Sequence, residues 1–325
     1  MLSLLVLLAL AYGFLNGFHD AANSIATVVS TRVLRPLHAV AWAASFNFLA
    51  IFLMQTSVAA TIGTGLIDQG AIDPAVVFGA LFGSIIWNLT TLRLGIPTSS
   101  SHALICSLAG AALAAAGPQA LIADGVTVFL LFVLLAPMIG LALGVALMIA
   151  VAHIFRWLAA RSADRLFRRL QLVSSAIYSI GHGSNDAQKT VGIIWLLLLG
   201  TGSTAASELP GWVTIASYAA VAGGTLFGGW RIVRTMGQRI VKLTPAGGFC
   251  AEAGGAGAIH LASFLGAPIS TTQTITASIV GVGIVNRLSS VRWGVAGVII
   301  WSWVLTLPAT ALLGAAGCYL GKRMF

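Results

Sequence analysis

The sequence has very little charge for its length. Only 8% of its 325 residues are Asp, Glu, Lys or Arg, whereas 58% are hydrophobic. Charged side chains make up roughly a quarter of a soluble globular domain, so this chain has too few of them to cover a water-exposed surface. The composition excludes an ordinary soluble domain and predicts an all-α polytopic membrane protein.

Cysteine and acidic residues are scarce as well. The three cysteines, Cys106, Cys250 and Cys318, are scattered through apolar surroundings, so neither a disulfide framework nor a zinc site is indicated. Eight acidic residues stand against 17 basic ones, but the basic residues occur in short segments between apolar runs, where they orient membrane proteins. We therefore expect a lipid bilayer as the partner of this chain, and no nucleic acid.

Ten apolar stretches are long enough to cross a membrane. They cover residues 1–30, 38–63, 75–92, 95–116, 121–155, 170–200, 210–229, 243–265, 267–286 and 292–320. The basic segment 156–169 divides them into an N-terminal transmembrane repeat, 1–155, and a C-terminal transmembrane repeat, 170–325. If this segment and the other basic loops are cytoplasmic, the five crossings of each half give two inverted repeats with both termini outside.

The layout of the two stretches that open at a proline stays undecided. Residues 95–116 and 267–286 are rich in Ser, Thr, Gly and Ala. They either cross the membrane as plain spans or form re-entrant hairpins, in which case the stretch 121–155 would split at Pro137. The sequence favours neither layout.

Two of the apolar stretches contain an aspartate within a similar motif. GFHDAAN at 17–23 aligns Asp20 with Asp186 of GSNDAQK at 183–189. A carboxylate at bilayer depth costs roughly 2.5–3.5 kcal/mol, so by default it marks an ion or substrate path. Because glycines flank both aspartates and amide side chains lie nearby, we predict that each motif breaks its helix.

A second motif is duplicated in the same order. GIPTSSSHALI at 95–105 aligns with GAPISTTQTIT at 266–276, which matches Pro97 with Pro268. The distance along the chain from aspartate to proline is 77 residues in the first half and 82 in the second. Two motifs in the same order at nearly equal spacing indicate an internal duplication.

The hydroxyl-rich motifs follow a proline at what is predicted to be the start of a helix. Free backbone N–H groups and the positive end of the helix dipole attract an oxyanion there, and hydroxyls donate to its oxygens. The alternative is that small residues only let helices pack closely. The candidate anion ligands are Ser99, Ser100, Ser101, Ser270, Thr271, Thr272 and Lys189. Lys189 is equally consistent with a role in neutralising Asp186.

The acidic residues within the spans are candidate co-ion ligands. Carboxylates beside neutral oxygens suit Na⁺ as well as a proton, although a carboxylate paired with a buried base would be structural. The candidate co-ion ligands are Asp20, Asn23, Asn185, Asp186, Glu252 and His19. His102 and His182 are further candidates for proton coupling, and Gln188 for a neutral oxygen. No resident metal or cofactor is predicted, only a co-transported H⁺ or Na⁺.

These two sets suggest a coupling mechanism. Ionised aspartates repel an incoming anion in a low-dielectric cavity, and a bound cation or proton removes that repulsion. The empty and the fully loaded forms would then be the ones that switch between the two sides of the membrane.

The paired motifs resemble those of the inorganic phosphate transporter (PiT) family, over essentially the whole chain. The segments that carry the resemblance are GFHDAANSIATVVSTR, GIPTSSSHALI, HGSNDAQKTVGII and GAPISTTQTIT, and they look like the bacterial low-affinity phosphate permease branch. The resemblance implies a homodimer in the bacterial inner membrane, and symport of phosphate, or metal-bound phosphate, with H⁺ or Na⁺. It implies a transporter and not an enzyme.

The chain departs from the family pattern at four positions. These are His19, Lys189 and Gln273, and Asn47, where sodium-coupled members carry glutamate. Fewer acidic ligands favour protons over sodium. Three alternatives stay open: a sulfate permease of the same family, a metal-ion permease, and an intramembrane enzyme that uses Ser99 to Ser101 with His102.

Overall fold

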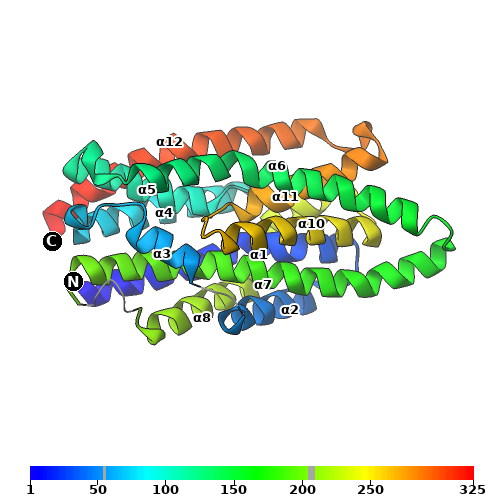
Figure 1. Ribbon diagram of the computed structural model, residues 1–325, viewed down its shortest axis with the longest axis horizontal. Helices are drawn as coiled ribbons and strands as arrows, with labels where there is room; N and C mark the ends of the chain where they lie inside the picture. The colour runs from blue at the N-terminus through cyan, green and yellow to red at the C-terminus, as the bar shows by residue number, and fades with distance from the viewer. Residues whose placement is uncertain (54–55, 204–208) are drawn as a thin grey trace.

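The computed structural model of the chain describes residues 1–53, 56–203 and 209–325. This part of the chain is helical, and its only extended pairing is an isolated bridge between Ile67 and Leu121. The α-helices in Figure 1 are α1 (Leu2–Ser30), α2 (Pro36–Leu49), α3 (Ser57–Thr64), α4 (Pro74–Leu94), α5 (Ser100–Ala116), α6 (Ala123–Ile154), α7 (Ala160–Gly200), α8 (Gly211–Phe227), α9 (Trp230–Arg234), α10 (Pro245–Phe264), α11 (Thr271–Asn286) and α12 (Trp293–Met324). The all-α prediction is confirmed.

The long helices are apolar on the outside of the molecule. α1, α4, α6 and α12 are each long and apolar enough to cross a membrane. On α6 and α12, Leu134, Trp301 and Leu312 are 67%, 74% and 72% exposed, which suits contact with lipid rather than with water. The chain is a multi-pass membrane protein.

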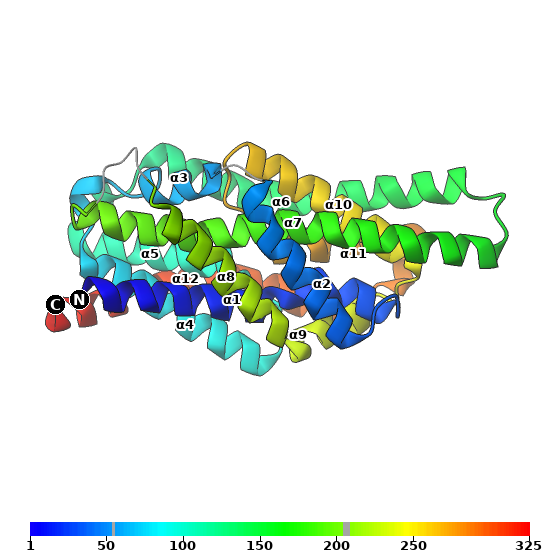
Figure 2. The same ribbon diagram turned by 90° about the horizontal axis from the view of Figure 1, so that it is seen from below.

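Both chain termini lie at one end of the long axis, and the connection between α6 and α7 lies at the other (Figures 1 and 2). Hydrogen bonds from arginine side chains to backbone carbonyls join several of the basic segments. The Arg168 guanidinium donates to the carbonyl of Arg32, and that of Arg231 donates to the carbonyl of Arg93. Lys322, near the C-terminus, instead donates to the carbonyl of Ala115. The side of the membrane that these loops face stays a prediction.

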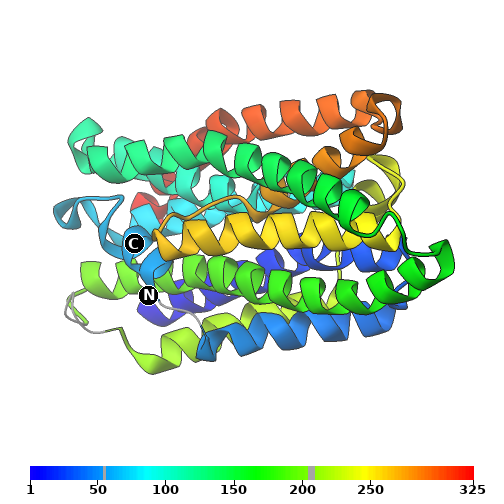
Figure 3. The ribbon, with the colours of Figure 1, turned by 45° about the vertical axis from the view of Figure 1, so that its right-hand side comes forward.

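The last helix of each predicted repeat packs against the other repeat. α6 packs on α10 and α11, whereas α12 packs on α4 and α5. Glycines allow this close approach, because a Cβ at Gly144 would lie 2.5 Å from the Ser278 carbonyl oxygen, and one at Gly314 would lie 2.0 Å from that of Ser107. α10 lies between α6 and α7 (Figure 3). The two halves are therefore interlocked.

The predicted helix breaks at the aspartate motifs are wrong. Asp20 lies inside the continuous helix α1, and Asp186 inside the 41-residue helix α7. The glycines of these motifs serve close packing instead. A Cβ at Gly17 would lie 2.0 Å from the carbonyl oxygen of Val221 in α8, and one at Gly183 would lie 2.4 Å from the Cα of Asn47 in α2.

The chain bends at other places. The stretch predicted as one span at 38–63 holds two helices, Pro36–Phe52 and Ser57–Thr64, inclined at 78°, and residues 54–55 between them lie outside the described part. Extended segments precede α5 and α11, and each follows a glycine in the left-handed region, Gly95 with φ 68° and Gly266 with φ 70°.

Two further details differ from the sequence prediction. α6 continues through Pro137, so the split proposed for the re-entrant layout does not occur. The predicted linker 156–169 is mostly helical, because α7 begins at Ala160 and its first turns carry all the arginines of this segment except Arg156.

Candidate functional site

The two aspartates meet in the interior of the molecule. Asp20 of α1 is 2% exposed and Asp186 of α7 is fully buried. One donor atom from each, together with one from His182, lies within 4.8 Å of the others. Residues 166 positions apart in the sequence thus form one buried polar centre, which the duplicated motif alone could only suggest.

Side chains from other segments satisfy the carboxylate of Asp20. The Ser100 hydroxyl donates to Oδ2 at 2.5 Å, and His19 Nδ1 lies 2.7 Å from Oδ1. The other ring nitrogen of His19 lies 3.0 Å from the Thr91 hydroxyl. These partners explain why the carboxylate can be buried without a break in its own helix.

Lys189 neutralises Asp186. Its ammonium donates to Asp186 Oδ1 at 2.6 Å, to the Ser101 hydroxyl, and to the Ile269 carbonyl oxygen at 3.1 Å. His182 Nε2 lies 3.2 Å from Asp186 Oδ2. Of the two roles considered for Lys189, pairing with the carboxylate is present in this structure, and contact with phosphate stays a prediction.

The hydroxyl motifs form the N-termini of α5 and α11, as predicted. Ser99 caps α5 by accepting from the backbone N–H of His102 at 3.1 Å, and Ser270 caps α11 by accepting from that of Gln273 at the same distance. The oxygens of these two serines are therefore occupied by capping. The hydroxyls that remain to reach the centre are those of the next two residues in each motif.

These hydroxyls meet the aspartate helices across the two halves. Asn23 of α1 donates to Thr272 at 2.9 Å and to Thr271 at 3.3 Å, both in α11. In the same way Lys189 of α7 donates to Ser101 of α5. The predicted anion ligands and the aspartates therefore lie in one buried cluster, in which these five side chains are each at most 1% exposed.

Two predicted ligands, Asn185 and Gln188, have other partners. Asn185 donates to the Ser263 hydroxyl at 3.1 Å, away from the aspartate pair. Gln188 accepts from the backbone N–H groups of Val58 and Ala59 at 2.9 and 3.2 Å, so it caps the start of α3. Its expected role as an ion ligand is replaced by a structural one.

Glu252 forms a second polar cluster of its own. Its Oε1 accepts from the Thr27 hydroxyl at 2.5 Å and from the Gln171 amide at 3.1 Å, and its Oε2 accepts from the Ser174 hydroxyl at 2.5 Å. Thr27 is seven residues after Asp20 on α1, which corresponds to about 10 Å along the helix axis. The glutamate is therefore near the centre but separate from it.

Sequence reasoning missed a pair of tyrosines. The Tyr12 hydroxyl donates to the Ser100 carbonyl oxygen at 3.2 Å, and the Tyr178 hydroxyl donates to that of Thr271 at 3.3 Å. Each tyrosine lies eight residues before an aspartate of the duplicated motif. That equal offset was the available signal.

His102 contacts Gln273 and Phe129. Its Nδ1 lies 3.3 Å from the Gln273 amide nitrogen, and its ring meets Phe129 edge-on. No contact in the described part of the chain joins this ring to a serine hydroxyl. The Ser–His arrangement that an intramembrane enzyme would need is therefore not formed here.

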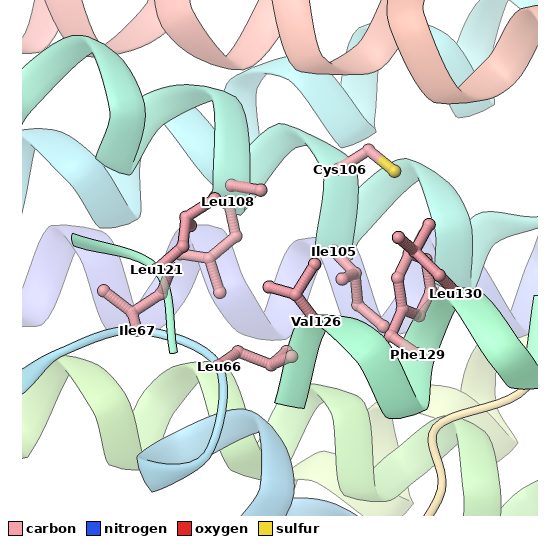
Figure 4. A pocket seen from close by; sticks show the side chains of 10 residues that line it. Leu66, Ile67, Ile105, Cys106, Leu108, Leu121, Val126, Phe129 and Leu130 are labelled. Atoms are coloured by element: carbon pink, nitrogen blue, oxygen red, sulfur yellow. The ribbon is translucent and has the colours of Figure 1, made fainter. Parts of the chain in front are cut away.

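Phe129 also lines an apolar pocket (Figure 4). It has a volume of about 130 Å³ and is lined by Leu66, Ile67, Ile105, Cys106, Leu108, Ala109, Leu121, Val126, Phe129 and Leu130. These side chains offer no strong hydrogen-bond donor to an oxyanion. The pocket is therefore not the anion site.

Known proteins resemble this chain over its whole length. The family model described as "Phosphate transporter family" matches residues 16–314. A probable low-affinity inorganic phosphate transporter of Rhizobium meliloti (strain 1021) is 52% identical over 98% of this chain and 96% of its own length. One of Bacillus subtilis (strain 168) is 42% identical over 99% of this chain and 97% of its own length.

A solved structure shares the fold. "The sodium-dependent phosphate transporter" superposes with a TM-score of 0.91 over 100% of this chain and 99% of that one, at 22% sequence identity. At this identity the match shows the fold alone, whereas the family rests on the sequence matches, which confirm the resemblance found in the motifs. The chain belongs to the phosphate transporter family, a family of transporters and not of enzymes.

Proposed function

We propose that the protein is a secondary active symporter that carries inorganic phosphate with H⁺ or Na⁺. The observation that carries this proposal is the buried centre in which two carboxylates lie beside hydroxyls at the N-termini of α5 and α11. A helix N-terminus binds an oxyanion, and an adjacent carboxylate binds a cation or a proton. The relatives named as phosphate transporters support phosphate over sulfate.

Phosphate would bind where the two hydroxyl motifs face each other. Ser100 and Ser101 of α5, with Thr271 and Thr272 of α11, would exchange their present partners for phosphate oxygens, while the capping serines hold the helix ends in place. Asp20, when ionised, would repel the anion. A proton or cation at Asp20 removes this repulsion, so phosphate and co-ion bind together.

Matched contacts in the two halves support an inverted repeat and alternating access. A Cβ at Gly83 would meet Ser107 Oγ at 2.6 Å, and one at the aligned Gly254 would meet Ser278 Oγ at 2.8 Å. Equivalent packing in halves that enter the membrane from opposite sides would let one bundle rock against the other. We further propose a bacterial inner-membrane location with both termini outside, and a homodimer.

The co-ion set is proposed to include Glu252. Its carboxylate is buried with three donors around it, and such intramembrane acids often serve ion or proton transfer. Asn47, where the family resemblance leads us to expect a glutamate in sodium-coupled members, donates to the Thr225 hydroxyl at 3.0 Å and adds no charge. This loss of an acid favours H⁺ as the co-ion.

The substrate form is proposed to extend to phosphate bound to a divalent metal. Donor atoms of Asp20, His182 and Asp186 lie within 4.8 Å of one another, and carboxylate with imidazole is a ligand set that divalent metals accept. Uptake of phosphate that rises with added Mg²⁺ or Mn²⁺ would support this form, and uptake unaffected by chelator would exclude it.

The proposed function is tested by phosphate uptake into proteoliposomes. We expect uptake driven by an imposed proton gradient, with little competition from sulfate. Asp20→Asn should lower it roughly a hundredfold, because truncating one member of a buried polar network removes interactions worth about 3–5 kcal/mol. Glu252→Gln should abolish the response to the proton gradient while the protein stays folded.

Asp164→Asn is the matched control. Asp164 lies on the exposed start of α7 and pairs with Arg168, a surface pair of small energetic value. Its substitution should leave uptake unchanged. Full uptake by both the Asp20 and the Glu252 variants would contradict the proposed coupling, and sulfate uptake faster than phosphate uptake would contradict the substrate.

A further inference from the structure

The ammonium of Lys189 lies in a set of oxygen ligands. Lys189 is fully buried, and its three contacts are a carboxylate oxygen of Asp186, the hydroxyl oxygen of Ser101 and the carbonyl oxygen of Ile269. Carboxylate, hydroxyl and backbone carbonyl are also the ligands that a hard metal cation takes in proteins. The lysine thus fills a site that would otherwise suit a small monovalent cation.

In the described part of the chain, the aligned place in the other half has no lysine or arginine. Asn23 stands where the second half has Lys189, and it donates to Thr272, which aligns with Ser101. Thr272 in turn lies 3.5 Å from Asp20 Oδ1. The carboxylate of Asp20 and the hydroxyl of Thr272 are therefore both present at the aligned place, without an ammonium between them.

Orphaned oxygens mark the same place as a ligand site. The side-chain oxygen of Asn23 is buried and has no hydrogen-bond partner in the described part of the chain, and neither does the hydroxyl of Ser24. A buried polar atom without a partner needs an explanation, and a bound ion supplies one where a carboxylate and a hydroxyl lie nearby. A cation next to Asp20 would satisfy the orphaned oxygen of Asn23.

We propose that Lys189 is a tethered cation that replaces one of two coupling ions, so that the site requires only one mobile cation, at Asp20 and Asn23. This inference rests on the proposed function, which supplies the phosphate and the coupling. The charges support it: when both carboxylates are ionised, Asp20 and Asp186 carry two negative charges, and Lys189 cancels one. A single mobile cation or proton then neutralises the pair.

The tether also predicts what its removal does. Lys189→Asn makes the second half like the first at this position and leaves the carboxylate of Asp186 unpaired. A second mobile cation must then bind before phosphate does, and Na⁺ suits the oxygen ligands that remain. The variant should therefore gain a dependence on Na⁺.

The experiment compares purified wild-type protein, Lys189→Asn and Lys189→Met. Phosphate uptake into proteoliposomes is measured at one pH gradient while Na⁺ replaces choline, and the thermal unfolding midpoint is measured in detergent without phosphate. For Lys189→Asn, uptake in choline should fall roughly a hundredfold, the cost of an unpaired buried charge. Uptake by this variant should recover when Na⁺ is added, with a Hill coefficient for Na⁺ one unit higher than that of the wild type. Na⁺ should also raise the thermal unfolding midpoint of the variant more than that of the wild type.

Lys189→Met is the matched control, because it removes the charge but adds no oxygen ligand. It should stay inactive in both salts. The inference is overturned if folded Lys189→Asn transports fully in choline, or if Na⁺ changes neither its uptake nor its midpoint. Failure of the wild type to take up phosphate would overturn the proposed function instead, while the Na⁺ effect on the midpoint would still test the tether.

Discussion

The two halves of the molecule share equivalent helix packing but differ in the side chains around Glu252 and around its aligned position. This carboxylate accepts hydrogen bonds from Gln171 and Ser174 of the second half and from Thr27 of the first. The alignment that pairs the motifs matches Glu252, Gln171, Ser174 and Thr27 with Leu81, Leu5, Leu8 and Ile193. These four aligned residues are apolar, and they belong to or pack against one hydrophobic core cluster.

The difference shows that the polar cluster is a unit. A buried carboxylate without donors is strongly unfavourable, and buried donors without an acceptor also lose free energy. The four polar residues therefore depend on one another. The proposed phosphate ligands occur in both halves, whereas this glutamate occurs in only one, as expected if it serves the co-ion and not the anion.

Placing a glutamate at Leu81, the apolar residue that aligns with Glu252, should have the largest effect on stability. Leu81→Glu places a carboxyl group in the buried hydrophobic cluster to which Leu5 and Ile193 also belong. We expect the free energy of unfolding to fall by about 3–5 kcal/mol, as for other uncompensated buried charges. The thermal midpoint and the monodisperse yield in detergent measure this loss.

Leu81→Met is the control for volume and should cost less than about 1.5 kcal/mol. In the other direction, Glu252→Leu leaves three donors without an acceptor and should cost about 1–3 kcal/mol. Wild-type stability in Leu81→Glu would mean that the two sides do not differ in polarity as the contacts indicate.

Substitutions of aligned glycines at helix contacts should lower the stability equally in both halves. A Cβ at Gly83 would lie 2.8 Å from the backbone nitrogen of Gly314, and one at Gly254 would lie 2.9 Å from that of Gly144. We expect Gly83→Ala and Gly254→Ala each to lower the free energy of unfolding by about 1–3 kcal/mol through overpacking. Thermal unfolding in detergent measures both.

Gly294→Ala is the matched control, since nothing lies within 4 Å of a Cβ at that position. It should not be destabilised. If one of the two interior glycine substitutions greatly lowered the free energy of unfolding and the other did not, the two halves would not share equivalent helix packing.

The sequence predicted the parts of the site that depend on local pattern. The aspartates, the hydroxyl motifs and the helix starts at these motifs follow from apolar runs, prolines and the internal duplication, and the all-helical fold follows from composition. Asp20 and Asp186 do meet, as their alignment suggested. These features need no knowledge of which segments touch.

The errors concern contacts between distant segments. The break predicted at Asp20 is absent because Ser100, 80 residues away, donates to its carboxylate, and Gly17 marks a close approach to Val221 rather than a flexible point. Gln188 has an amide oxygen of the kind that can bind an ion, but this oxygen caps α3. Residue type sets what a side chain can bind, and the packing of helices decides what it does bind.

Removing the two tyrosine hydroxyls should give the smallest and most symmetric effect. Tyr12→Phe and Tyr178→Phe each delete one bond to a carbonyl at the start of a hydroxyl helix, which should cost about 0.5–1.5 kcal/mol of unfolding free energy. Tyr319→Phe, 59% exposed, is the control and should cost nothing measurable. Because these bonds position Ser100 and Thr271, the KM for phosphate should rise by similar factors in both variants. Unequal KM values would show that phosphate binds mainly to one hydroxyl motif.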